Sequence, residues 1–163
     1  MAPHGSITTL SGIRFWPLLP NPGDILVEDI AHALAHQCRF GGHASKFYSV
    51  AEHSVHVSEL CPVQDALWGL LHDASEAYLI DLPRPLKLLP EFAPYREAER
   101  QLQRAVAARF GLPEDQPASV TEADDTYAVD RSSFTPRLDA GGGYPGDAPS
   151  IRDHGATAAG SGN

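Results

Sequence analysis

The stretch Leu70-Leu71-His72-Asp73-Ala74-Ser75-Glu76-Ala77-Tyr78 places three ionisable side chains inside an apolar run with helical spacing. On an α-helix, His72 and Glu76 stand one turn apart on one face and Asp73 lies beside His72, so all three can point into one cavity. The buried flank of this helix would consist of Leu67, Leu70, Leu71, Ala74 and Ala77. A charge against such a flank must be paired or must coordinate a metal. The stretch therefore predicts either a metal site or a core histidine beside a capped Asp.

Two other polar positions favour the metal site. His53 stands in Ala51-Glu52-His53-Ser54, and Asp124 stands in Glu122-Ala123-Asp124-Asp125. This order of H, then HD, then D, together with Asp81-Leu82-Pro83-Arg84-Pro85-Leu86-Lys87, closely resembles the HD-domain metal-dependent phosphohydrolases. The resemblance is closest to the small branch that contains 5'-deoxynucleotidases and short phage-type dATP triphosphohydrolases. It covers about residues 24 to 131.

The resemblance implies an all-α fold, an HD-domain helical bundle over residues 24–135. The proline-rich residues 1–23 predict an irregular or hairpin lead-in. Residues 136–163 form a glycine-rich tail, with seven glycines between 141 and 163, and such a composition cannot bury enough apolar surface to fold alone. The length of 163 residues suits one domain with a single core.

Apolar spacing and breakers predict five helices and a stiff, non-helical loop at Asp81–Pro85. The expected helices run from Asp24 or Glu28 to Phe40, from about Tyr48 to Leu60, from about Gln64 to Tyr78, from Ala93 to Phe110 with Gly111 as C-cap, and from Pro117 or Ser119 to Arg131.

The net charge of -9, with only 12 Lys and Arg, argues against a nucleic-acid polymer as partner. A small phosphorylated metabolite remains compatible, because a local group of cations can bind it. Cys38 and Cys61 form no CxxC pair, which excludes a zinc finger and predicts reduced thiols. No stretch approaches the ~18 apolar residues of a membrane span. We expect a cytoplasmic protein, in the host cytoplasm if it is phage-encoded.

The resemblance implies one divalent ion bound by His53, His72, Asp73 and Asp124, with Asp125 as the alternative fourth ligand. Two imidazoles and two carboxylates suit transition metals such as Mn, Co or Zn better than Mg, which remains possible. His56 is expected at the surface or behind the ligands. The HxxxH of His32 and His36 lacks the Glu that a zincin needs and is predicted to be structural.

Further roles follow from the same resemblance. Glu76 would be the base that activates water, and Asp81 a second acidic residue that takes a proton or holds a sugar hydroxyl. Arg39 would clamp phosphate and Phe40, in place of the tryptophan of some relatives, would pack against C2' of the sugar. Lys46 and Lys87 would either meet a longer phosphate chain or be solvated surface cations.

The expected function is metal-dependent hydrolysis of deoxynucleoside 5'-phosphates. The favoured reaction converts dATP to deoxyadenosine and triphosphate, and the alternative is a 5'-deoxynucleotidase acting on monophosphates. A non-catalytic nucleotide-binding HD module and, less favoured, a redox oxygenase are the rivals from other classes. P-loop and GxGxxG motifs are absent from the sequence. We expect a homodimer or higher oligomer that binds a small-molecule deoxynucleotide.

Overall fold

The computed structural model describes residues 5–129, and helices dominate this part of the chain. The helices are α1 (Val27–Ala35), α2 (Val50–Leu60), α3 (Ala66–Leu71), α4 (Glu76–Leu79), α5 (Arg84–Lys87), α6 (Ala93–Phe110) and α7 (Ala118–Val129), with 3₁₀ turns η1 (Pro22–Asp24), η2 (Arg39–Gly42) and η3 (Pro90–Phe92). This confirms the predicted mainly helical architecture. The predicted tail at 136–163, the boundary at 135 and the predicted helix end at Arg131 lie outside the described residues.

Of the two forms expected for the lead-in, irregular or hairpin, the structure shows a hairpin. Strands β1 (Ile7–Thr8) and β2 (Arg14–Phe15) pair antiparallel, with Ile7 opposite Phe15, and they make the one sheet found within residues 5–129. Gly12 adopts φ +80 in the turn, a conformation that glycine takes without steric cost. Phe15 is 1% exposed and its ring lies 4.3 Å from that of Tyr78, so the hairpin packs onto the helical core.

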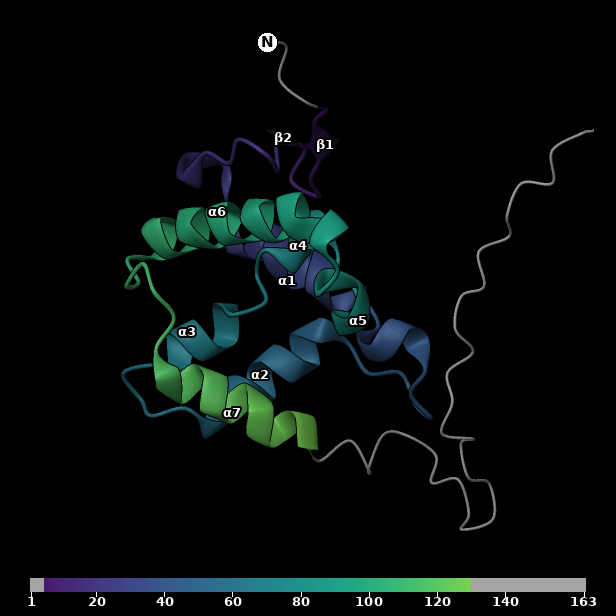
Figure 1. Ribbon diagram of the computed structural model, residues 1–163. Coiled ribbons are helices and arrows are strands. Elements are labelled where there is room, and N and C mark those ends of the chain that lie inside the picture. The colour runs from purple at the N-terminus through teal and green to yellow at the C-terminus, as the bar shows by residue number, and fades with distance from the viewer. Residues whose placement is uncertain (1–4, 130–163) are drawn as a thin grey trace, which may run out of the picture.

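The helices form two groups (Figure 1). α1, α4 and α6 lie on the hairpin side, while α2, α3 and α7 lie together on the other. α2 packs against α1, α3 and α7 and therefore joins the two groups. One apolar cluster includes Ile30, Leu71 and Leu102, and the other includes Trp68 and Val120.

The prediction for α6 is confirmed. Its bounds are Ala93–Phe110, and Ala98, Leu102 and Val106 are buried at helical spacing. Gly111 follows with φ 69, the left-handed conformation that ends helices and favours glycine.

The first predicted helix is wrong at both ends. α1 starts at Val27 and stops at Ala35, five residues before Phe40. The chain leaves the helix early because its backbone pairs elsewhere: Arg39 N–H donates to the Tyr48 carbonyl at 2.9 Å, and Val50 N–H donates to the Gln37 carbonyl at 3.0 Å. For the same reason α2 starts two residues after Tyr48, where the Ser49 hydroxyl caps it by accepting from Glu52 N–H at 3.0 Å.

The predicted continuous helix from Gln64 to Tyr78 is also wrong. α3 ends at Leu71, a turn covers residues 72–75, and α4 begins at Glu76. Backbone bonds through this break join residues three apart, as from Glu76 N–H to the Asp73 carbonyl at 2.9 Å and from Tyr78 N–H to the Ser75 carbonyl at 3.1 Å.

The expected flank of that helix is only partly buried. Leu71 and Ala74 are in the core, and Ala77 is half-buried against it. Leu67 and Leu70, however, are 45% and 37% exposed. α3 directs Trp68 and Leu71 inward, and this orientation leaves Leu67 and Leu70 at the surface.

The loop predicted at Asp81–Pro85 contains the start of a helix, so this prediction is wrong from Arg84 onward. α5 begins at Arg84, directly after Pro83, and Pro85 stands in its first turn. A proline at this position removes no helical hydrogen bond, because the first N–H groups of a helix have no partner within the helix.

Candidate metal centre

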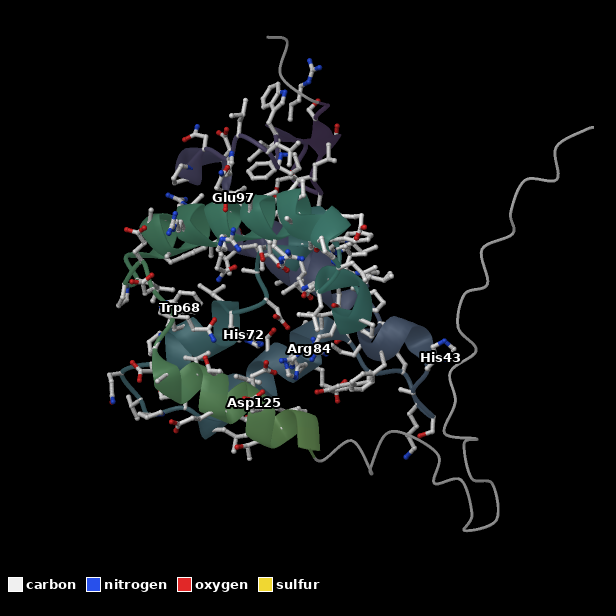
Figure 2. The ribbon with its side chains drawn as sticks, in the orientation of Figure 1. His43, Trp68, His72, Arg84, Glu97 and Asp125 are labelled. Carbon is white, nitrogen blue, oxygen red and sulfur yellow. The ribbon has the colours of Figure 1, made fainter. Side chains whose placement is uncertain are left out.

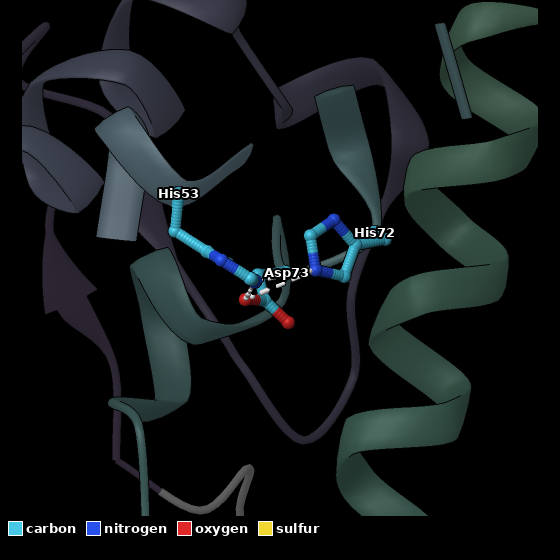
Figure 3. Close-up of side chains that lie close together, drawn as sticks. All are labelled: His53, His72 and Asp73. Atoms are coloured by element: carbon cyan, nitrogen blue, oxygen red, sulfur yellow. Dashed lines mark hydrogen bonds and ion pairs between the residues drawn. The ribbon is translucent and has the colours of Figure 1, made fainter. Parts of the chain in front are cut away.

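Two histidines from different helices meet inside the fold. His53 stands in the middle of α2 and is 1% exposed, and His72 directly follows α3, with a side chain 5% exposed. Their Nε2 atoms lie 3.2 Å apart, and Asp73 lies beside them (Figure 3). The two helices approach closely at Gly69, where a Cβ would lie 2.8 Å from Cys61 Sγ and 3.0 Å from Ser58 Cα.

The second ring nitrogen of His72 is used by the backbone. His72 Nδ1 lies 2.7 Å from the Gly69 carbonyl, which can only accept, so Nδ1 carries the hydrogen. The lone pair of the neutral ring is then on Nε2, facing His53. Metal-binding histidines are commonly oriented by such a bond from the other ring nitrogen.

Two carboxylates complete the cluster. Asp73 Oδ2 lies 3.3 Å from His72 Nε2 and 3.7 Å from His53 Nε2. Asp124, on α7, places Oδ1 3.0 Å from His53 Nε2 and 4.0 Å from His72 Nε2. This Oδ1 is buried, and although it is close to His53 it makes no well-directed hydrogen bond within the described residues.

His53, His72 and Asp73 could therefore hold a metal ion, with Asp124 adjacent to them. The donor set fits a divalent transition metal, because it offers two imidazole nitrogens and carboxylate oxygens within one small volume. Two Nε2 atoms at 3.2 Å cannot both present lone pairs without a proton or a cation near them. The surroundings of the cluster are thus compatible with a bound cation.

The close packing of these ionisable groups shifts their pKa values. Burial lowers the pKa of His53 and outweighs the opposing contact with Asp124. Burial also disfavours the charged form of His72, but the negative charge of Asp73 and its hydrogen bond overcome this and raise the pKa of His72 to about 9. The pKa of Asp73 is well below its ordinary value, because His72 and Arg39 outweigh its burial.

Arg39 pairs with Asp73 of the cluster and with Asp81 outside it. Its Nη1 donates to Asp73 Oδ2 at 3.1 Å and lies 3.9 Å from Asp81 Oδ2. Next to it Phe40 adopts φ 58, and the Arg39 guanidinium lies 5.8 Å from the centre of the Phe40 ring. The two residues predicted to contact phosphate and sugar therefore lie side by side, with Arg39 directed at a proposed metal ligand.

A cavity of about 620 Å³ opens beside the cluster. Seven of the predicted site residues line it: Arg39, Phe40, Asp73, Glu76, Asp81, Lys87 and Asp124. Arg84, His43 and Asp125 also line it, and no role had been predicted for the first two. Figure 2 labels these three side chains, which come from α5, from the residue after η2 and from α7.

Glu76 occupies a buried position in this wall. It is 4% exposed, so the alternative of an ordinary surface glutamate is wrong. Its Oε1 accepts from Lys87 Nζ at 3.2 Å, and Lys87 also donates to Glu99 at 2.7 Å. Burial, followed by the charges of Asp73 and Asp81, raises the pKa of Glu76 to about 8 despite Lys87. Burial also raises the pKa of Asp81, although Arg39 opposes it.

Three predicted positions do not join the cluster. Lys46 lines a separate cavity of about 200 Å³ and is not among the residues that line the cavity of Lys87. His56 pairs with Glu59 at 3.5 Å and stacks on Tyr127. Asp125 lines the large cavity, but the carboxylate that contacts His53 and His72 belongs to Asp124.

Two glutamines that the sequence did not single out brace the HD segment. Gln103, on α6, bonds to Ser75 and Leu71, and Gln37 bonds to Glu76 and Asp81. Glutamine is common on helix surfaces, so neither carried a recognisable signal. Arg84 could have been noticed as the remaining cation of the Asp81–Lys87 segment.

No helix within residues 5–129 combines the length and the apolar character that a membrane span needs. No family model matches the chain. An uncharacterized protein of Rhodobacter capsulatus is 43% identical over 123 residues, which cover 70% of this chain and 62%, less than two thirds, of that relative. The uncharacterized protein YfdR of Escherichia coli (strain K12) is 44% identical over 142 residues, which cover 82% of this chain and 78% of YfdR. The chain therefore belongs to the same protein family as YfdR.

Proposed function

We propose that the protein is a metal-dependent phosphohydrolase that acts on deoxynucleoside 5'-phosphates. The observation that carries this proposal is the convergence of His53, His72, Asp73 and Asp124 beside a cavity of about 620 Å³. The resemblance of the H, HD, D order to the HD phosphohydrolases supports the same function. The residues available to hold the ion are these four.

The charge of the cavity wall supports a dependence on metal. Five carboxylates line it, against the three cations Arg39, Arg84 and Lys87, so the wall carries an excess of two negative charges when all are ionised. An anionic substrate would be repelled from such a wall. A divalent cation supplies Lewis-acid chemistry, neutralising charge on a phosphate oxygen and lowering the pKa of water. We therefore expect phosphate binding to require the metal.

Glu76 has the properties of the base. Its Oε2 is buried and has no hydrogen-bond partner among the described residues, so it can accept a proton from the attacking water. Lys87 holds the other oxygen and fixes the carboxylate in the wall. A divalent cation held by these ligands would lower the pKa of Glu76 from about 8, because its positive charge would offset the charges of the nearby Asp73 and Asp81.

The sugar preference rests on Phe40, which lines the cavity. A ribose 2'-hydroxyl against an apolar ring would lack a partner, and an unpaired buried hydroxyl costs ~1 to 3 kcal/mol, or ~5 to 150-fold in rate. Deoxyribose should therefore be preferred.

For the phosphate chain we favour triphosphate, and specifically conversion of dATP to deoxyadenosine and triphosphate. Arg84, rather than Lys46, lines the cavity together with Arg39 and Lys87, so three cations are available for the phosphate chain. The choice of adenine rests on the family resemblance. Hydrolysis of deoxynucleoside monophosphates is the alternative.

The test is a panel of deoxy- and ribonucleoside mono-, di- and triphosphates, each incubated with pure protein and Mn²⁺, Co²⁺, Zn²⁺ or Mg²⁺. Chromatography should reveal deoxyadenosine and triphosphate from dATP, and no product after chelation. Equal consumption of ATP and dATP would refute the role of Phe40. Nucleotide binding without hydrolysis in the presence of any of the four metals would favour the non-catalytic HD module. Light scattering on the same sample tests the proposed homo-oligomer.

A further inference from the structure

The side chain of Gln103 fills a break in the helix that would otherwise carry the HD pair. In a continuous α-helix, Ser75 N–H would donate to the Leu71 carbonyl, four residues earlier. Instead, Ser75 N–H donates to Gln103 Oε1 at 3.2 Å, and Gln103 Nε2 donates to the Leu71 carbonyl at 2.7 Å. One amide from α6 thus bonds to both groups whose mutual hydrogen bond is missing.

This insertion explains why α3 and α4 are separate helices. A side chain that enters the backbone ladder is a recognised cause of helix kinks. Ser75 N–H and the Leu71 carbonyl each keep a hydrogen-bond partner, so the break leaves neither group unpaired. The backbone bonds around the break join residues three apart: the Leu71 carbonyl also accepts from Ala74 N–H at 3.0 Å, and Glu76, Ala77 and Tyr78 continue the pattern.

The tighter turn determines which acidic side chains share a face. With 3.6 residues per turn, His72 and Glu76 would lie together and Asp73 and Glu76 would be about 60° apart. With about 3.0 residues per turn, residues three apart eclipse each other. Asp73 and Glu76 both line the large cavity, in agreement with this geometry, and His72 Nε2 lies 3.2 Å from His53 Nε2.

We propose that Gln103 is a positioning residue for the metal centre. By holding the helix open between Leu71 and Ser75, its amide directs Asp73 toward the two histidines and places Glu76 in the same cavity wall. This inference rests on the proposed metal site. Among the hydrogen bonds of the described residues, Gln103 bonds to the backbone of Ser75 and Leu71 and to none of the proposed metal ligands, so it acts through the backbone that carries them.

Gln37 shows the same pattern at the other end of the segment. Its Nε2 donates to the Glu76 carbonyl at 3.0 Å, and its Oε1 accepts from Asp81 N–H at 3.3 Å. The segment from Leu71 to Asp81 is therefore held at both ends by amide side chains from other parts of the chain.

The experiment compares Gln103→Met, which keeps the length of the side chain and removes both bonds, with Gln101→Met. Gln101 is exposed on the same helix, and its side chain bonds only to Glu97 among the contacts seen in the described chain. For each purified full-length protein, Mn²⁺ affinity is measured by calorimetry, the Co²⁺ complex by visible absorption, and the folding of the metal-free form by circular dichroism.

Gln103→Met should weaken Mn²⁺ binding by about 10 to 100-fold, as expected when a group that orients metal ligands is lost, and should alter the Co²⁺ spectrum. Gln101→Met should match the wild type within about twofold. Wild-type affinity and spectrum in a folded Gln103→Met protein would overturn the inference.

If Gln103→Met fails to fold, Gln103→Glu provides the test. The glutamate keeps an acceptor for Ser75 N–H and loses the donor to the Leu71 carbonyl. A folded Gln103→Glu protein with weakened Mn²⁺ binding supports the inference, and one with wild-type binding overturns it. Absence of Mn²⁺ and Co²⁺ binding in the wild type would instead overturn the metal centre itself.

Discussion

Replacing Gly69 by alanine should disturb the crossing of α2 and α3 that brings His53 to His72. The new Cβ would lie 2.8 Å from Cys61 Sγ, 3.0 Å from Ser58 Cα and 3.3 Å from Ser58 N. A side chain such as Cys61 can rotate away, but the other two atoms belong to the backbone of α2. The helices must therefore separate by a few tenths of an ångström.

The magnitude follows from two opposing effects. Overpacking of this kind costs ~1 to 3 kcal/mol, whereas replacing a helical glycine by alanine gains about 0.5 to 1 kcal/mol. Gly69→Ala should thus lower the free energy of unfolding by roughly 1 to 2 kcal/mol. Because the Gly69 carbonyl also orients His72, Mn²⁺ affinity should fall as well.

The assay is urea unfolding of the metal-free protein, followed by Mn²⁺ calorimetry on the folded variant. Cys61→Ala in the Gly69→Ala background should restore part of the lost stability, since it removes the 2.8 Å contact and leaves those with Ser58. A Gly69→Ala protein as stable as the wild type, with unchanged metal affinity, would refute the reasoning.

Three other predictions concern the site. Asp73→Ala should abolish tight metal binding and turnover, and elemental analysis that still finds stoichiometric metal would remove Asp73 from the ligand set. Because the pKa of Glu76 is raised to about 8 from 4.5, the stability it contributes to the metal-free protein is fully present below pH 4.5 and is lost as pH rises through about 8. Glu76→Gln should therefore raise the melting temperature relative to wild type above pH 8 and little at pH 4, and a pH-independent difference would contradict this. Arg84→Ala should reduce kcat/KM for dATP by about tenfold and for dAMP much less, since a charge-assisted bond contributes ~1.5 kcal/mol or more. Arg100→Ala, which removes a cation paired with Glu97 outside the cavity, is its control, and an equal loss with both substrates would remove Arg84 from the phosphate chain.

The sequence predicted the mainly helical fold and most of the charged residues of the cavity wall, because these depend on local spacing and on short motifs. It could not predict the break after Leu71. That break depends on an amide 28 residues away in sequence from Ser75, and helical periodicity carries no information about such a contact. The predicted continuous helix from Gln64 to Tyr78 is wrong for this reason.

Lys46 shows a second limit. It precedes Tyr48 in a segment that pairs with residues after α1, and this pairing turns Lys46 into a different cavity from Lys87. Charge alone did not distinguish it from Arg84, which the start of α5 brings to the large cavity. Tertiary contacts therefore decided which cations belong to the site.

The central claim is tested most directly by an anomalous-difference map from a crystal grown with Mn²⁺ or Co²⁺. We predict a single strong peak within bonding distance of the Nε2 atoms of His53 and His72 and of carboxylate oxygens of Asp73 and Asp124. A map with no peak at this position, or with the metal bound elsewhere on the chain, would contradict the proposed metal centre.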